Sequence, residues 1–143
     1  MATVLNTPGY SGKPLPQKLG LAEGQRVAFL HEPEHWDSII GPMPADVQRF
    51  AKPANDLDLV ILFVTESVKL AKEFPKLTES MAPGGMIWVS WPKKAANVKT
   101  DLDENVVREI GLRGDWVDVK VCAVSDVWSG LKFLRRKATK TIA

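Results

Sequence analysis

Two histidines and two glutamates stand within five residues, in the run His31-Glu32-Pro33-Glu34-His35. The spacing matches the H-E-x-x-H pattern of zinc proteases, in which both histidines lie on one face of a continuous helix and the glutamate activates a metal-bound water. Proline between the histidines removes a helical hydrogen bond and clashes with the preceding turn. An apolar segment with the character of a strand also ends directly before the run. The sequence therefore predicts a polar loop here and no metal site.

Polar side chains also follow the other apolar segments that resemble strands. Thr65 follows the run Leu59–Val64, and Lys93 and Lys94 follow a run that ends at Trp91. In open α/β sheets, ligands bind outside the carboxyl ends of the strands, so these positions form one candidate site. The two lysines precede a helix predicted to start at Thr100, whose positive end favours an anion such as phosphate or carboxylate. The candidate ligand-binding residues are His31, Glu32, Thr65, Trp91, Lys93, Lys94, Thr100, Asp101, Asn105 and Arg108.

Both the strand ends and the predicted helix have a simpler interpretation. Asp101, Asn105 and Arg108 fall at spacings of four and three, which places them on one face of the helix. Glu104 and Arg108 also form an i,i+4 pair of the kind found on solvated helices, and the strand ends are equally typical of solvated loops. No nucleophile paired with a base, no pair of acids at a known spacing and no convincing set of metal ligands can be located, so we assign no catalytic residue.

The elements that must position these residues alternate between strand and helix. The runs 27–30, 59–64 and 86–91 are apolar and suit the parallel strands of a sheet covered on both faces. A short helix is predicted over 34–40, followed by a loop to about residue 56. Longer helices are predicted over 67–81, with a kink at Pro75, and from Thr100 to Gly111. Residues 117–124 and 131–136 predict an antiparallel hairpin. The predicted fold is a single Rossmann-like three-layer α/β domain whose mostly parallel sheet has about five strands.

Length and composition fit one globular domain, because the chain has 143 residues, of which 45% are hydrophobic and 25% charged. We expect an extended arm over residues 1–20, where glycine and proline cluster, and the Rossmann-like domain over 21–143. The longest apolar run is far shorter than the roughly 20 residues that span a bilayer. The start of the chain has no secretory pattern, and Cys122 is the only cysteine. We therefore expect a cytoplasmic protein with no membrane contact.

Two resemblances follow from this order of segments. The run Met81-Ala-Pro-Gly-Gly-Met-Ile87 and the terminal hairpin resemble class I S-adenosylmethionine-dependent methyltransferases. The resemblance covers roughly residues 21–136 and implies the strand order first, second, third, fifth, fourth. The chain departs from that pattern after the first strand, where the family has a glycine-rich turn and this chain has His31–His35. The family's second strand, which ends in an acidic residue that binds the cofactor ribose, has no counterpart between Pro44 and Asp56. We therefore expect no bound S-adenosylmethionine.

The second resemblance spans nearly the whole chain. The runs GYSGKPLPQKLGL, WPKK, TDLDENVVREIGL and VDVKVCAVSDVWSGLKF are similar to a bacterial family of small uncharacterised proteins. This resemblance implies the fold and a bacterial cytoplasmic setting. It transfers no catalytic residue.

These observations favour a non-catalytic module that binds a small anionic ligand or a protein partner. One alternative is a methyltransferase-like enzyme that acts at the carboxyl edge of the sheet, with His31, Glu32 or Asp101 as acid–base groups. Another is weak nucleic-acid binding through Lys93, Lys94 and the basic tail. The tail lacks an aromatic residue for base stacking, and the net charge is only +2, so we expect no nucleic-acid partner. The basic residues of the tail are Lys132, Arg135, Arg136, Lys137 and Lys140.

Overall fold

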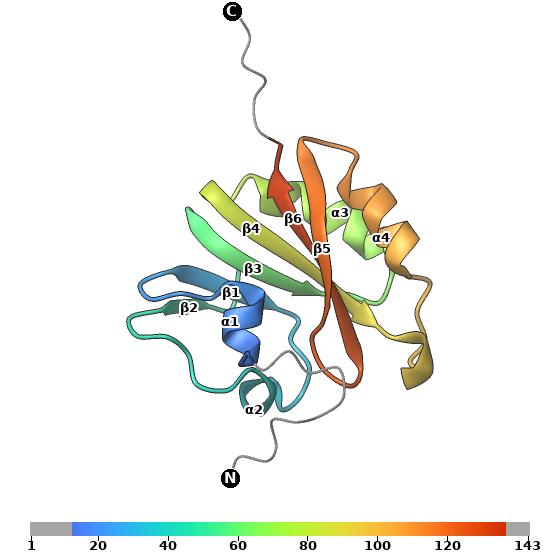
Figure 1. Cartoon of the computed structure of the whole chain (residues 1–143). Helices are drawn as coiled ribbons and strands as arrows, with labels where there is room; N and C mark the ends of the chain where they lie inside the picture. The colour runs from blue at the N-terminus through green and yellow to red at the C-terminus, as the bar shows by residue number, and fades with distance from the viewer. Residues whose placement is uncertain (1–12, 137–143) are drawn as a thin grey trace, which may run out of the picture.

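The computed structural model describes residues 13–136 and contains one six-stranded sheet in the order β2-β1-β3-β4-β6-β5. The strands β2, β1, β3 and β4 are parallel, and β6 runs antiparallel to both β4 and β5. This confirms the predicted single α/β domain, its terminal hairpin and the relative order of the five predicted strands; Figure 1 shows the arrangement. The strands are β1 (Arg26–Leu30), β2 (Gln48–Phe50), β3 (Leu57–Phe63), β4 (Met81–Pro92), β5 (Trp116–Ala123) and β6 (Trp128–Arg135).

Two helices cover each face of the sheet. Helices α1 (Leu15–Leu19) and α2 (Trp36–Ile40) pack on one face, and α3 (Ser67–Thr78) and α4 (Glu104–Gly111) pack together on the other. Successive side chains of β3 point to opposite faces of the sheet and are buried on both. Val60 packs in the core on the α3 and α4 side, Ile61 packs in the core on the α1 and α2 side, and both are fully buried. Within residues 13–136, no helix combines the length and the apolar character needed to cross a membrane.

The described end of the predicted arm is not extended. Residues Leu15–Leu19 form a helical turn that starts after Pro14 and ends at Gly20, whose φ of +93° is a left-handed conformation that glycine adopts readily. The indole Nε1 of buried Trp88 donates a hydrogen bond of 2.8 Å to the carbonyl oxygen of Leu19. Proline at a helix start is favourable rather than disruptive, which is why the prediction of an extended arm was wrong here. Residues 1–12 of the predicted arm lie outside the described residues.

The two long helices differ from their predicted bounds. Helix α3 continues through Pro75 to Thr78, and Met81 already belongs to β4. On α3, Val68 is 76% exposed, whereas Leu70 is fully buried in the core. Helix α4 begins at Glu104 rather than Thr100 because Asp103 is the cap: its Oδ1 accepts a hydrogen bond of 2.9 Å from the backbone N–H of Val106.

Strand β2 lies within the predicted loop, so only a short segment remains between β2 and β3. It pairs with the first half of β1, with Gln48 beside Arg26 and Phe50 beside Ala28. Only residues 51–56 then connect β2 to β3, whereas parallel strands are usually joined by a dozen or more residues that include a helix. Phe50 and Ala54 pack against the core on the α3 side, so this crossover passes over that face of β1.

Strand β5 forms one edge of the sheet and is irregular. Its pairing with β6 shifts register between Asp118 and Lys120, and both Val119 and Val121 are exposed. Lys120 lies directly opposite Lys132 on β6. Burial, together with the nearby charge of Lys120, lowers the pKa of Lys132.

Candidate functional site

The ten predicted site residues do not share one cavity. Five of them, Trp91, Lys93, Lys94, Thr100 and Asp101, line a cavity of about 840 Å³ beyond the end of β4. We call it the lysine cavity. His31 instead lines a separate cavity of about 320 Å³ beside α3. The other four, Glu32, Thr65, Asn105 and Arg108, line neither. The expected single site along the carboxyl edge is therefore divided, because His31 lies against α3 whereas the lysine cavity is formed by the segment that follows β4.

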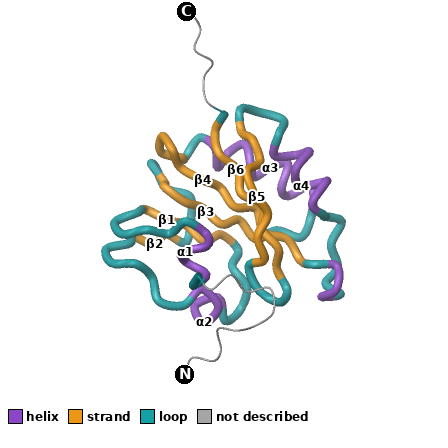
Figure 2. Tube along the Cα trace, in the orientation of Figure 1, coloured by secondary structure: helices purple, strands orange, loops and turns teal. Residues whose placement is uncertain are grey.

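The lysine cavity is open to solvent and is lined mostly by the long segment between β4 and α4. Figure 2 shows this segment as loop with one short helical turn, η2 (Lys94–Ala96). Trp91 and Pro92 at the end of β4 are buried, and Ser129 of β6 lies beside them in the wall. The Thr100 hydroxyl connects the segment to the loop that follows β3, since it donates to the carbonyl oxygen of Thr65 over 2.6 Å. Thr100 and Thr65 therefore position this wall.

The carboxylates that line the lysine cavity already have hydrogen-bond donors. Asp101 accepts bonds from the backbone N–H and the hydroxyl of Ser67, over 2.8 and 2.7 Å, at the first residue of α3. These bonds, led by the hydroxyl of Ser67, lower the pKa of Asp101. Asp103 caps α4, and Glu104 pairs with Arg108. Each acidic side chain therefore holds an element of the fold in place.

The lysine side chains of the cavity, unlike its carboxylates, are not used by the described part of the fold. Lys93, Lys94 and Lys99 line its wall, and none of them forms an ion pair with a residue in the described range 13–136. Lys94 and Lys99 are exposed and Lys93 is half-buried. Sequence reasoning missed Lys99, although it stands next to Thr100 and within six residues of Lys93. The cavity therefore offers three ammonium groups to a ligand.

Arg108 does not face a ligand cavity. Its Nε donates to Asp118 on β5 over 2.8 Å, and its remaining donors reach Glu104 and Asn105. Glu104 and then Asp118 raise the pKa of Arg108 above its usual value, and Arg108 lowers the pKa of Asp118. The predicted stripe of Asp101, Asn105 and Arg108 does not form one helix face, because Asp101 precedes α4. Arg108 connects α4 to the sheet, which agrees better with a structural role than with a ligand contact.

The loop after β1 uses its charged residues in the same structural way. His31 has a left-handed φ of +59°, and its Nε2 lies 3.0 Å from Oε1 of Glu73 on α3. Arg49 of β2 binds Glu32 over 3.0 Å and Asp37 over 2.8 Å. His35 also has a positive φ and precedes α2, so the two histidines do not lie on one continuous helix. Contacts with α3 and with β2 therefore hold the loop after β1 in place.

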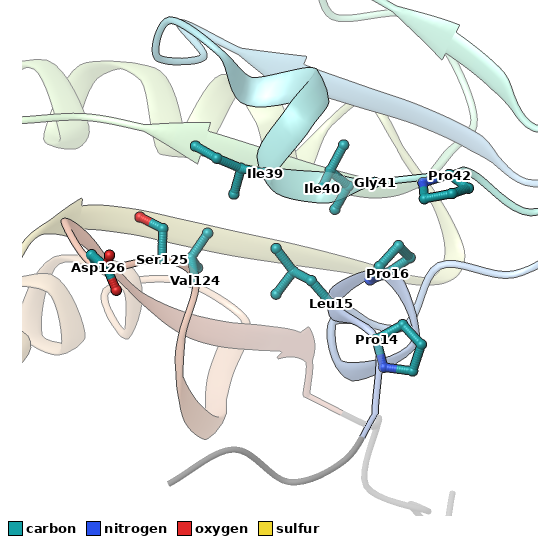
Figure 3. Close-up of a pocket in the computed structure, with 10 residues that line it drawn as sticks. All are labelled: Pro14, Leu15, Pro16, Ile39, Ile40, Gly41, Pro42, Val124, Ser125 and Asp126. Atoms are coloured by element: carbon teal, nitrogen blue, oxygen red, sulfur yellow. The ribbon is translucent and has the colours of Figure 1, made fainter. Parts of the chain in front are cut away.

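A third cavity contains none of the predicted residues. It measures about 650 Å³ and lies between α1, α2 and the turn of the β5–β6 hairpin, as Figure 3 shows. Its lining is mainly apolar, with Leu15 and Ile39 facing Val124 across the space, and Asp126 is the only ionisable residue among the described residues that line it. It offers no pair of acid and base groups. No sequence pattern indicated this cavity, because its walls come from three segments that are distant in the chain.

The basic tail is partly used by the fold. Arg135 donates to the carbonyl oxygen of Thr78 over 3.1 Å, and its guanidinium carbon lies 4.9 Å from the ring centre of Trp116. Lys137 and Lys140 lie outside the described residues. The part of the tail that the structure describes therefore does not present a row of free cations.

Comparison with known proteins identifies the fold. No family model matches the chain, and no curated protein matches it. Solved structures with the same fold include a SAM-dependent methyltransferase from Aquifex aeolicus and two putative methyltransferases, which confirms the methyltransferase-like fold. The DhpI–SAH complex is 10% identical, with a TM-score of 0.61, over 87% of this chain and 83% of that one.

Two further structures show the same likeness. One is the complex of the Haloferax volcanii Trm112 methyltransferase activator with a putative methyltransferase. A chain of this complex has 8% sequence identity to the present chain and a TM-score of 0.62, and the match covers 89% of each chain. TrmN from Thermus thermophilus is 9% identical, with a TM-score of 0.53; the match covers 86% of this chain and only 47% of TrmN. At these identities the likeness establishes the fold.

The residues present do not fit S-adenosylmethionine in the manner that the resemblance implies. The loop from His31 to His35 has no glycine, and His31 and Glu32 are engaged by Glu73 and Arg49. The expected absence of a second strand was wrong, because β2 exists. It nevertheless ends in Phe50 and is followed by Ala51 and Lys52, so no carboxylate stands at its end to accept the hydroxyls of a ribose.

Proposed function

We propose that this protein is a non-catalytic module on a methyltransferase-like fold that binds a small phosphate- or carboxylate-bearing ligand in the lysine cavity. One observation carries the proposal: Lys93, Lys94 and Lys99 surround a cavity of about 840 Å³ without ion-pair partners in the described chain, whereas the cavity's carboxylates already accept hydrogen bonds. Ammonium groups bind phosphate and carboxylate as point charges. The volume lies within the range of small-molecule sites.

The positions of the acid and base groups support a binding role rather than catalysis. His31 and Asp101 were the best candidates for acid–base chemistry, but they line different cavities. Each also has a partner in the fold, Glu73 for His31 and Ser67 for Asp101. A general acid and base must both reach the reacting atoms, and this geometry separates them.

Thermal stability in the presence of ligands tests the proposal. Pyrophosphate and citrate should raise the Tm at low ionic strength, because a ligand that binds only the folded state stabilises it, and uncharged glucose should not. Replacing Lys93, Lys94 and Lys99 together by methionine should reduce the affinity for pyrophosphate by at least about tenfold.

A matched control uses the exposed lysines Lys69 and Lys72 of α3, which lie outside the cavity. The double change Lys69→Met and Lys72→Met should leave pyrophosphate affinity unchanged apart from a small loss of long-range attraction. The proposal is wrong if neither anion raises the Tm, or if the control lowers affinity as much as the triple change does.

The fold itself favours methyl transfer as a second candidate function. The neighbours include methyltransferases and the DhpI–SAH complex, and this chain has the same overall fold as they do. Calorimetric titration with S-adenosylmethionine tests this candidate. Binding that Lys52→Glu strengthens and a bulky change in the His31 loop abolishes would support it. A titration at a protein concentration of about 0.1 mM detects binding with a dissociation constant of about 0.1 mM. The absence of binding heat under these conditions would reject methyl transfer as a function.

A further inference from the structure

The α3 side of β1 contains a second, differently built cavity. It measures about 320 Å³ and lies between the end of β1, the crossover that follows β2, and α3. We call it the crossover cavity; its lining includes Leu30, Ala51, Lys52, Lys76 and Leu77. It exists because residues 51–56 cross β1 without a helix, so α3 has no helical neighbour on this side.

The floor of the crossover cavity is apolar. Leu30 and Leu77 are 5% and 2% exposed and belong to the core, and the small side chains of Ala51 and Pro53 form the opposite wall. The cavity is open to solvent, so a ligand with a hydrocarbon part would remove these apolar side chains from water. The volume is at the lower end of the range for ligand pockets. A short hydrocarbon chain or a single ring therefore matches the space.

The rim of the cavity determines the charge of its ligand. Its one carboxylate, Glu73, is paired with His31 at 3.0 Å, whereas Lys52 and Lys76 form no ion pair with any residue from 13 to 136. Both lysines are exposed and have long side chains whose stems cover apolar surface while the ammonium groups stay at the rim. The rim therefore presents two free positive charges above an apolar floor.

We infer that the crossover cavity binds a small apolar carboxylic acid, with its hydrocarbon part against Leu30 and Leu77 and its carboxylate between Lys52 and Lys76. This site is independent of the lysine cavity and uses a different chemistry. The walls of the lysine cavity are polar and apolar in about equal parts, whereas the walls of the crossover cavity are mainly apolar. The acid takes the place that a crossover helix would fill.

The probe for this site is octanoate, with 1-octanol as its uncharged counterpart. Two-dimensional NMR of the full chain should show saturable octanoate-induced shifts at Leu30, Ala51 and Leu77, and octanol should bind about tenfold more weakly because it lacks the charge. Lys52→Met with Lys76→Met should weaken octanoate binding by about tenfold and leave octanol binding unchanged. Lys72→Met, on the same helix but outside the cavity, is the matched control.

A second variant tests the location of the site without disturbing the core. Ala51 is exposed, so Ala51→Trp fills the cavity from its outer wall while the fold stays intact, as the unchanged Tm should show. This variant should abolish the octanoate-induced shifts at Leu30 and Leu77. Unchanged octanoate binding in Ala51→Trp, equal binding of octanoate and octanol, or the absence of saturable shifts overturns the inference.

Discussion

The loop after β1 and the segment after β4 stand at the same edge of the sheet, and both are rich in charged residues. In the β1 loop, His31 and Glu32 are each joined to a neighbouring element, by Glu73 and Arg49. In the β4 segment, acidic and basic residues differ. The acidic side chains accept hydrogen bonds from the fold, whereas the lysines have no ion-pair partner among the described residues. A charged residue at a strand end is therefore a candidate for ligand binding only where the fold does not use it.

Replacement of Asp101 should have the largest effect on stability. Asp101→Asn weakens the two bonds to Ser67 and removes a negative charge from the start of α3, where the helix dipole favours it. We expect the Tm to fall by roughly a few degrees in calorimetry. Asp126→Asn is the control, since Asp126 is an exposed side chain on the hairpin turn. An equal Tm for both variants would show that the β4 segment is not held by its acids.

The pH dependence of stability should follow the same carboxylate. The pKa of Asp101 is lowered in the folded state, so its contribution is complete above its unfolded value of about 3.9 and is lost as the pH falls through the lower folded value. The stability difference between the native chain and Asp101→Asn should therefore be constant from pH 7 to about pH 5 and shrink below about pH 4. Urea unfolding at several pH values measures this difference. A difference that grows toward low pH contradicts the assignment.

Replacement of Arg49 should cost less. Arg49 binds Glu32 and Asp37, and its guanidinium carbon lies 4.8 Å from the ring centre of Phe29, but its side chain is 34% exposed. Arg49→Met should lower the free energy of unfolding by about 0.5–1 kcal/mol, because solvent screens exposed ion pairs. Arg113→Met removes a more exposed pair with Glu109 and should cost a few tenths of a kcal/mol at most. Equal losses of unfolding free energy in the two variants would mean that the contacts of Arg49 do not stabilise the loop after β1.

The smallest effect is expected for Lys94. It forms no ion pair within residues 13–136, so Lys94→Met should change the free energy of unfolding by no more than about 0.5 kcal/mol. Urea unfolding gives this value. A loss as large as that of Arg49→Met would remove the contrast between the two segments, since Lys94 would then be structural as well.

The central strands were predictable because burial on both faces leaves continuous apolar runs, as in Leu59–Val64. Strand β2 was not, since its three residues include exposed Gln48 and Arg49 and carry no periodic pattern. The start of α4 was ambiguous because Thr100 and Asp103 are both good caps, and only the folded structure shows that Thr100 binds Thr65 instead.

The candidate site was less predictable than the fold. The sequence placed Trp91, Lys93, Lys94, Thr100 and Asp101 near one another correctly, because they follow one strand. It could not show that Asp101 binds Ser67, 34 residues earlier in the chain, or that Arg108 turns to Asp118. Whether a charged group is free depends on such distant partners. A single sequence does not contain them.

The irregular edge strand β5 has a consequence for the behaviour of the protein at high concentration. Unpaired backbone groups and the exposed valines Val119 and Val121 would otherwise form a template on which strands of other molecules could add, as in fibril growth. The register shift between Asp118 and Lys120 interrupts the regular pairing of this strand, and the charged residue Lys120 lies between the two valines in the sequence. The irregularity thus protects the molecule from self-templated aggregation at the end of its sheet.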